Sequence, residues 1–77
     1  MITAYVFIQA QVGRSADVGA EVAQIEGVRS ADVVTGPYDV IALVEAASMD
    51  DLGKLVVAKI QAVEGVTRTL TCPVIRF

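Results

Sequence analysis

A short repeat divides the chain into two similar halves. Ile25-Glu26-Gly27-Val28 in the first half is matched by Val63-Glu64-Gly65-Val66 in the second. In both copies, apolar residues at helical spacing precede the glycine, and a segment rich in β-forming residues follows it. Glycine readily adopts the left-handed conformation that ends a helix. The repeat therefore predicts two β-α-β halves, in which each helix ends and the next strand begins at the repeat.

The first half predicts a strand followed by a helix. Between residues 3 and 12 the even positions are apolar, and Tyr5 and Phe7 occupy odd positions among polar residues. Because side chains alternate across a sheet, one face of this strand suits packing against helices and the other is partly aromatic. Residues 15–26 then place apolar residues at helical spacing, with Ser15 as the expected N-cap.

Two further strands are expected in the middle of the chain. They cover residues 28–35 and 38–46, and the turn-forming residues Gly36 and Pro37 separate them as in a hairpin. The segment 40–44 is apolar on both of its faces. Such a pattern is typical of a central strand that is covered from both sides.

The second half predicts another helix and a last strand. Ser48 and Asp51 have the spacing of a capping box, in which each residue binds the other's amide. An apolar stripe continues through Val63, and the last strand is expected over residues 66–75. Pro73 cannot donate a hydrogen bond to a neighbouring strand. This strand should therefore lie at a sheet edge near its end, or carry a bulge there.

The elements together predict an α+β, ferredoxin-like βαββαβ sandwich that occupies residues 1–77 as one domain. Its four-stranded antiparallel sheet would carry both helices on one face and leave the face with Tyr5 and Phe7 bare. A chain of 77 residues with 55% hydrophobic composition has more apolar surface than it can bury alone. We therefore expect a homo-oligomer that dimerises through the open sheet face.

The charge and the N-terminal segment narrow the partners and the location. A net charge of −3 opposes direct nucleic-acid binding, which depends on basic residues that neutralise phosphates. Arg14 is interpreted as a single solvated arginine near a helix start. Residues 1–12 alternate as a strand, unlike a signal or membrane segment, and one cysteine permits no internal disulfide. We expect a cytoplasmic protein without a membrane partner.

The residues also argue against catalysis and against a metal or cofactor. The chain has no histidine, which is the commonest general base and a common metal ligand. Cys72 has no histidine to activate it, and it alternates with Leu70 and Val74, so we expect a buried structural thiol. Asp50 and Asp51 are adjacent on a helix and favour its dipole rather than a shared metal.

Asp39 is the carboxylate that most needs an explanation. It follows the Gly36-Pro37-Tyr38 turn and opens an otherwise apolar strand, so it must find a hydrogen-bond donor. Backbone amides of the turn are one source of donors. An amine or amide from a ligand or a partner chain is the other, and the two can coexist.

These residues resemble a known family. Gly36-Pro37-Tyr38-Asp39, then Leu52, Gly65-Val66 and Thr69-Leu70-Thr71, are similar in order and spacing to the effector-binding (RAM) domain of the Lrp/AsnC regulators. The resemblance covers essentially the whole chain. It implies a βαββαβ domain that dimerises through its sheets and joins dimers into octameric or similar rings. Because the sequence starts at the first strand, it resembles the stand-alone members that lack a helix-turn-helix.

The resemblance also implies an effector pocket between neighbouring dimers. Gly36 would let the backbone approach the ligand, Tyr38 would supply a ring wall and a hydroxyl, and Asp39 would pair with an α-ammonium group. Thr69 and Thr71 of the last strand would supply hydroxyls.

Met49, near the start of the second helix, matches a position close to that effector region and can adapt to an apolar side chain. A plain helix-start residue that covers the sheet edge is the alternative. The implied function is binding of an amino acid or similar small molecule, whose occupancy shifts the assembly equilibrium. Such a domain would regulate amino-acid metabolism without a DNA-binding domain of its own.

Two other functions stay open. Dimeric α+β barrels of this fold also include small monooxygenases and isomerases, and a deep apolar pocket inside each monomer would favour that alternative. The chain would instead be an assembly partner if it inserts into the rings of full-length Lrp/AsnC regulators.

Overall fold

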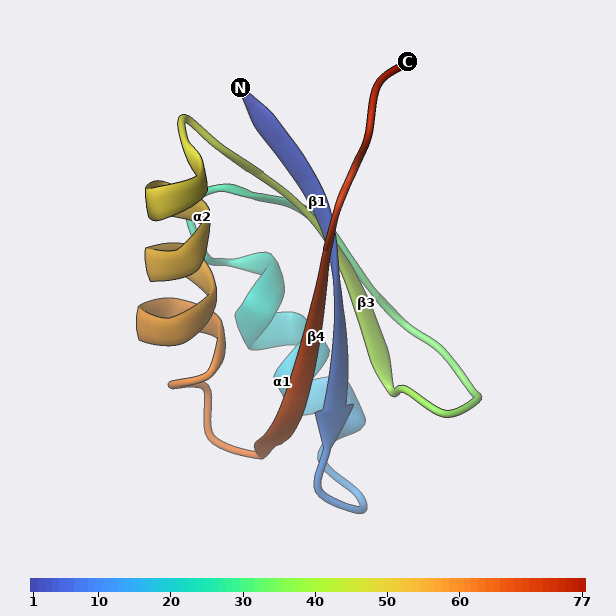
Figure 1. Cartoon of the computed structure of the whole chain (residues 1–77). Coiled ribbons are helices and arrows are strands. Elements are labelled where there is room, and N and C mark those ends of the chain that lie inside the picture. Colours follow the sequence, from blue (N-terminus) through green and yellow to red (C-terminus); the bar gives the residue numbers. More distant parts are fainter.

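Four strands and two helices, the second made of the consecutive segments α2 and η1, follow one another in the predicted order (Figure 1). The computed structural model describes all residues from Met1 to Phe77. The elements are β1 (Ile2–Ala10), α1 (Ser15–Ala23), β2 (Val28–Val33), β3 (Val40–Ala46), α2 (Met49–Lys54), the π-helical segment η1 (Leu55–Ile60) and β4 (Val66–Pro73). The predicted ferredoxin-like βαββαβ fold is therefore confirmed.

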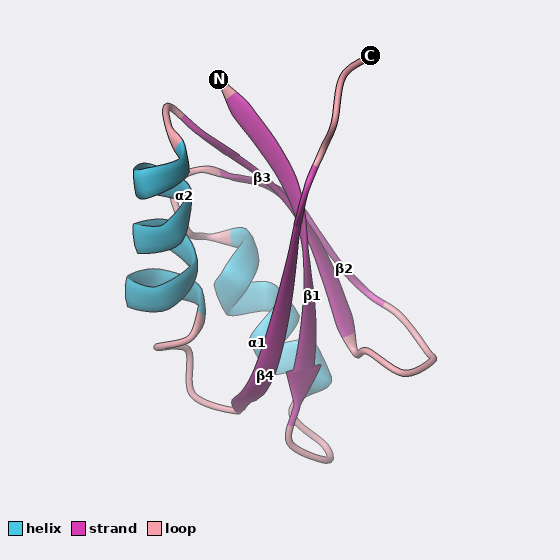
Figure 2. Ribbon diagram, viewed as in Figure 1, coloured by secondary structure: helices cyan, strands magenta, loops and turns pink.

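The strands form one antiparallel sheet in the order β2-β3-β1-β4, with both helices packed on the same side of it (Figure 2). The expectation that the third strand is central is confirmed. The last strand lies at a sheet edge, and Pro73 is its final residue, paired with Ala4. The proline thus occupies a position where a missing N–H costs little.

The hydrophobic core lies between the sheet and the helices. Of the even positions that the alternation assigns to this face, Ala4, Val6 and Ile8 are fully buried and Ala10 is partly buried. Alternate residues of β3 from Val40 to Val44 are also fully buried. Helical residues cover them from the other side. The helix-side members of the core are Val18, Val22, Leu52, Val56 and Ile60.

The second helix differs from the single α-helix that the apolar stripe predicts. Only α2 is α-helical, and the chain then widens into η1, where the amide of Gln61 donates to the carbonyl of Val56, five residues earlier (2.9 Å). Residues four apart lie near one face of either helix type. The spacing of Leu52, Val56 and Ile60 therefore could not distinguish the two.

The helix starts agree with prediction in one case and not in the other. The Ser48 hydroxyl accepts from the amide of Asp51 (3.1 Å), so the serine half of the capping box forms. Ser15 is not an N-cap, because the helix already includes it and Arg14 precedes it without a side-chain cap. The first helix also ends at Ala23, earlier than residue 26.

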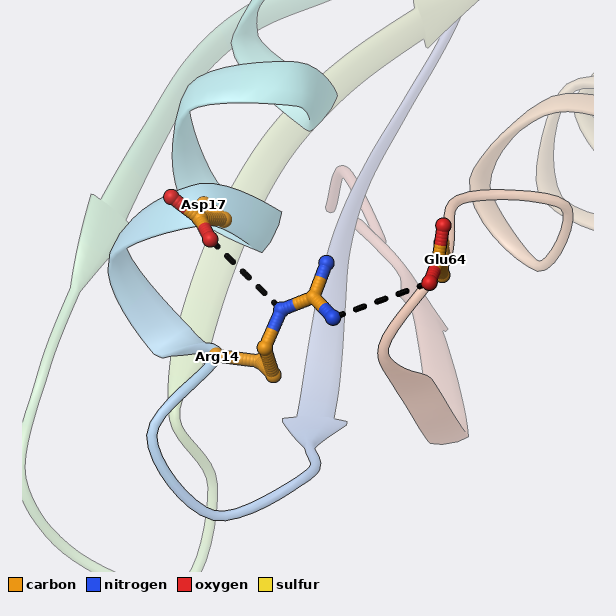
Figure 3. Close-up of polar contacts among 3 residues, drawn as sticks. All are labelled: Arg14, Asp17 and Glu64. Atoms are coloured by element: carbon orange, nitrogen blue, oxygen red, sulfur yellow. Dashed lines mark ion pairs between the residues drawn. The ribbon is translucent and has the colours of Figure 1, made fainter.

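Arg14 is a bridging residue rather than the solvated arginine that its loop position predicts (Figure 3). Its Nε lies 3.5 Å from Asp17 Oδ2, and its Nη1 lies 3.7 Å from Glu64 Oε1. The side chain is only 34% exposed. Arg14 thereby connects the start of α1 with the second copy of the repeat, a long-range contact that loop composition does not reveal.

The other face of the sheet is uncovered in the single chain. Tyr5 and Phe7 pair across the sheet with Leu43 and Ile41 of β3 on one side, and with residues of β4 on the other. We call this surface, formed by Tyr5, Phe7, Ile41, Leu43, Leu70 and Cys72, the open face. The predicted partly aromatic second face of β1 is therefore present.

Cys72 is exposed, so the prediction of a buried thiol is wrong for the single chain. The physical reason is the register of β4. Leu70 and Cys72 pair with Phe7 and Tyr5, and so they point to the open face rather than toward the helices. Cys72 and Leu70 do share one strand face, as the alternation predicts, but no other element of the chain covers that face.

Candidate effector-binding site

The loop between β2 and β3 is longer than the predicted two-residue turn. β2 ends at Val33 and β3 begins at Val40, and the loop is closed by a hydrogen bond from the Val34 amide to the Asp39 carbonyl (2.8 Å). Gly36 has φ +136°, a conformation that other residues rarely adopt. No atom lies within 4 Å of where its Cβ would be. The loop therefore presents an open stretch of backbone.

Asp39 is satisfied by a donor that neither sequence-based explanation named. The backbone amide of Ala10, at the end of β1, donates to Asp39 Oδ2 (2.7 Å). The Asp39 amide in turn donates to the carbonyl of Ile8 (2.9 Å). Asp39 is half-buried, and both its backbone and its side chain are hydrogen-bonded to β1. Its Oδ1 has no donor from the protein and can accept another hydrogen bond.

Tyr38 lies over the end of the open face. Its ring centroid is 5.5 Å from that of Phe7, with an angle of 57° between the rings, which is a favourable tilted arrangement. The neighbouring carbonyl of Pro37 accepts from Gln9 Nε2 (2.9 Å). These contacts fasten the loop onto β1, so that the loop backbone, the Tyr38 ring and the Asp39 carboxylate form one fixed surface.

The two threonines of the last strand face the other side of the sheet. Thr69 pairs with Ile8 and Thr71 with Val6, both of which point toward the helices. Thr69 Oγ1 accepts from Gln61 Nε2 (2.9 Å). Within one chain, therefore, these hydroxyls do not converge with Tyr38, which lies beside the open face.

Met49 lies far along the sheet from the loop. α2 begins after the end of β3 that pairs with Ile2, whereas Asp39 bonds to the opposite end of β1 (Figure 1). Met49 and Thr71 border a shallow hollow of about 330 Å³ between α2, η1 and β4. The predicted site residues thus separate into a loop group (Gly36, Tyr38, Asp39) and an edge group (Met49, Thr71), with Thr69 paired to Gln61.

Three contributors to the loop geometry were missed by the sequence reasoning. They are the side chain of Gln9, the amide of Ala10 and the ring of Phe7. Gln9 carries a usable signal, because it is a polar residue on the same strand face as two aromatic ones. The Ala10 amide carries none, since a backbone donor is the same at every position.

A larger hollow, which we call the α1–β2 hollow, lies elsewhere. It measures about 760 Å³ and lies among the α1–β2 turn, the end of β3 and the α2–η1 helix. Neither α1 nor the α2–η1 helix has the length that a membrane-spanning helix requires.

Comparison with known proteins gives one family. The sequence model of the Lrp/AsnC ligand binding domain matches residues 3–77. An uncharacterized HTH-type transcriptional regulator from Pyrococcus furiosus is 34% identical over 55 residues, which are 71% of this chain and 37% of the regulator. The chain thus spans little more than a third of the length of the curated relatives that it matches.

Solved structures share the fold along the whole chain. TTHA0845 from Thermus thermophilus is 38% identical with a TM-score of 0.93, and the match covers 100% of this chain and 96% of that one. A feast or famine regulatory protein from M. tuberculosis, solved in complex with L-methionine, is 28% identical with a TM-score of 0.82. That match covers 100% of this chain and 52% of the regulatory protein.

Proposed function

The chain belongs to the Lrp/AsnC ligand-binding domain family, and we propose that it is a self-assembling domain that binds an amino acid and performs no catalysis. The observation that carries this proposal is the fixed carboxylate of Asp39, which has one oxygen bound to the Ala10 amide and the other without a protein donor. The complex of the M. tuberculosis relative with L-methionine supports an amino acid as the ligand class.

The loop group suits the invariant part of an amino acid. Asp39 Oδ1 accepts from the α-ammonium group, and a charge-assisted hydrogen bond of this kind is about twice as strong as a neutral one. The open backbone at Gly36 allows close approach, and the Tyr38 ring forms a wall. Because the loop is already fastened to β1, little ordering free energy is lost on binding.

The edge group, together with Thr69, completes the site from a neighbouring subunit. Met49, Thr69 and Thr71 do not reach the loop within one chain, so a site that uses both groups requires at least two chains. In this arrangement, dimers form through the open face and join into octamer-like rings with the ligand at the dimer–dimer contact. Ligand binding then favours the assembled state by its difference in affinity for the two states.

We place the domain in the cytoplasm and propose that full-length regulators of the family are its partners. The HTH-type regulators to which it is similar support partners of this kind. The enzyme alternative gains no support, because the α1–β2 hollow is open and has five charged side chains on its border, unlike a deep apolar pocket.

Isothermal titration with each proteinogenic amino acid, together with native mass spectrometry, tests this function. We expect heat and bound mass with at least one amino acid, L-methionine being the first to try. Asp39→Asn keeps an acceptor for the Ala10 amide but removes the charge, so the Kd should rise about tenfold or more. Asp50→Asn, an exposed helix residue, is the matched control and should bind normally.

The contrary result is an assembled protein that binds none of the amino acids. An oligomer that stays empty and copurifies with a full-length regulator would replace amino-acid sensing by the assembly-partner function.

A further inference from the structure

The α1–β2 hollow has an apolar part, which we call its floor. The floor is formed by Ile25 of the α1–β2 turn, Ala46 of β3, and Leu55 and Ala58 of η1. Gly27 holds these elements together, since its carbonyl accepts from the Glu45 amide (2.8 Å). A Cβ on Gly27 would lie 3.2 Å from the Glu45 carbonyl oxygen and 3.3 Å from Leu55 Cδ2, and its φ is +97°. Only glycine fits this close approach, so the floor is fixed by backbone contacts.

The π-helical turn brings two lysines to the same border of this hollow. Lys54 precedes η1 and Lys59 lies within it, five residues later. In an α-helix, residues five apart point about 140° away from each other. In a π-helix the hydrogen bond joins residues five apart, which places them about one turn above each other. Both lysines line the hollow, and the π-helical geometry explains how two residues five apart reach the same border.

Acidic groups stand on the same border and are not neutralised by these lysines. Asp51 lies one turn before Lys54 on α2, and Glu26 lies on the α1–β2 turn. None of the four residues takes part in an ion pair within the chain, whose ion pairs involve only Arg14 and Arg29 as cations. The remaining acid of the border, Glu45, is already paired with Arg29. Separate charges of both signs thus surround an apolar floor.

We propose that this hollow is a second binding site, contained in one chain, for a small zwitterion with an aliphatic side chain. The ligand carboxylate lies at Lys54 and Lys59, its ammonium group at Asp51, and its side chain on the floor formed by Leu55 and its neighbours. Such a ligand would form charge-assisted hydrogen bonds with lysines and an aspartate that have no ion-pair partner within the chain. The site does not depend on the loop site proposed above, because the two share no residue.

Methyl NMR spectra of the intact protein, labelled at Ile, Leu, Val and Ala methyl groups, test the site with L-valine as the probe. We expect shifts at the floor methyls of Ile25, Ala46, Leu55 and Ala58. Lys54→Gln and Lys59→Gln should each raise the Kd about tenfold, because each removes one charge-assisted contact. Arg76→Gln removes an exposed cation away from the hollow and should leave the Kd unchanged.

Two analogues of L-valine separate a zwitterion site from simpler ones. Isobutylamine lacks the carboxylate and isovalerate lacks the ammonium group, so both should bind about tenfold more weakly or worse. Isovalerate binding as tightly as L-valine would overturn the proposal, as would unmoved floor methyls or normal affinity in both lysine variants. Shifts confined to the Val34 methyls, beside the β2–β3 loop, would support the loop site and refute this one.

Discussion

At the scale of single residues, the backbone conformation at Gly65 connects the repeat to the packing of the two halves. Gly65 has φ +99°, and a Cβ there would lie 3.0 Å from Val18 Cγ2 and 3.3 Å from Arg14 Cβ. Any side chain at this position would therefore both strain the backbone and crowd the residues at the start of α1.

Gly65→Ala should therefore lower the free energy of unfolding by about 1–3 kcal/mol, the usual cost of a strained backbone site. Gly53→Ala is the matched control. Gly53 lies in α2 with nothing within 4 Å of its Cβ position, and alanine is the better helix former by about 1 kcal/mol. Chemical denaturation of both variants measures the difference, and equal stability would show that the repeat glycine is not required by its conformation.

The fixed carboxylate of Asp39 makes a second prediction at this scale. Asp39→Ala leaves the half-buried Ala10 amide without its acceptor and should cost about 1–3 kcal/mol of stability. Asp39→Asn keeps an acceptor oxygen and should cost less than half as much. Thermal unfolding of the two variants without ligand measures this order. If the alanine variant is as stable as the asparagine variant, the hydrogen bond does not hold the loop.

The sequence predicted part of this site and could not predict the rest. Polarity and turn chemistry were enough to single out Asp39 as a carboxylate in need of a donor. The donor itself, Ala10, is 29 residues away in sequence and is set by the pairing of the strands. The same register sends Thr69 to the helix side of the sheet. Long-range pairing of this kind is not visible in local composition.

At the scale of elements, the second helix shows what apolar spacing can and cannot predict. It predicted which residues reach the core, since Leu52, Val56 and Ile60 are all buried. It did not predict the change from α2 to η1, because both hydrogen-bond patterns place residues four apart near one face.

Truncations along this helix should reflect burial and not hydrophobicity alone. Ile60→Ala removes a fully buried side chain and should cost about 2–5 kcal/mol. Val57→Ala, three residues earlier and 64% exposed, should cost less than about 0.5 kcal/mol. Urea titration of each variant gives the comparison. A large loss at Val57 would indicate that this side chain is covered in the assembled protein.

At the scale of the whole molecule, the single chain leaves too much apolar surface in water. Only 13 of its 77 residues are buried, and the open face carries Tyr5 at 45% and Leu70 at 48% exposure. Burial of apolar area contributes about 25 cal/mol per Å², so covering this face with a second copy gives a large driving force. The sequence pattern indicates that the open face needs a partner. The geometry of that contact depends on a second chain, so the pattern of one chain cannot predict it.

Leu70→Lys tests whether a second chain packs against the open face. In the single chain the substitution meets no crowding, because the side chain is half in water, so the monomer should keep its fold. Against a second sheet, the lysine would be an unpaired charge in an apolar contact, which should raise the dimer dissociation constant at least about 100-fold. Val12→Lys, at a fully exposed position of the β1–α1 loop, adds the same charge away from the open face and should leave assembly unchanged.

Sedimentation velocity of both variants, with circular dichroism to follow the fold, distinguishes the outcomes. If Leu70→Lys is a folded monomer and Val12→Lys still assembles, the subunit contact lies on the open face. If both variants assemble like the original chain, the contact lies on another surface, and the exposed helix side with Val57 becomes the face to mutate next. Because the two substitutions add equal charge, a difference between them cannot arise from net charge, and it must come from where the lysine stands.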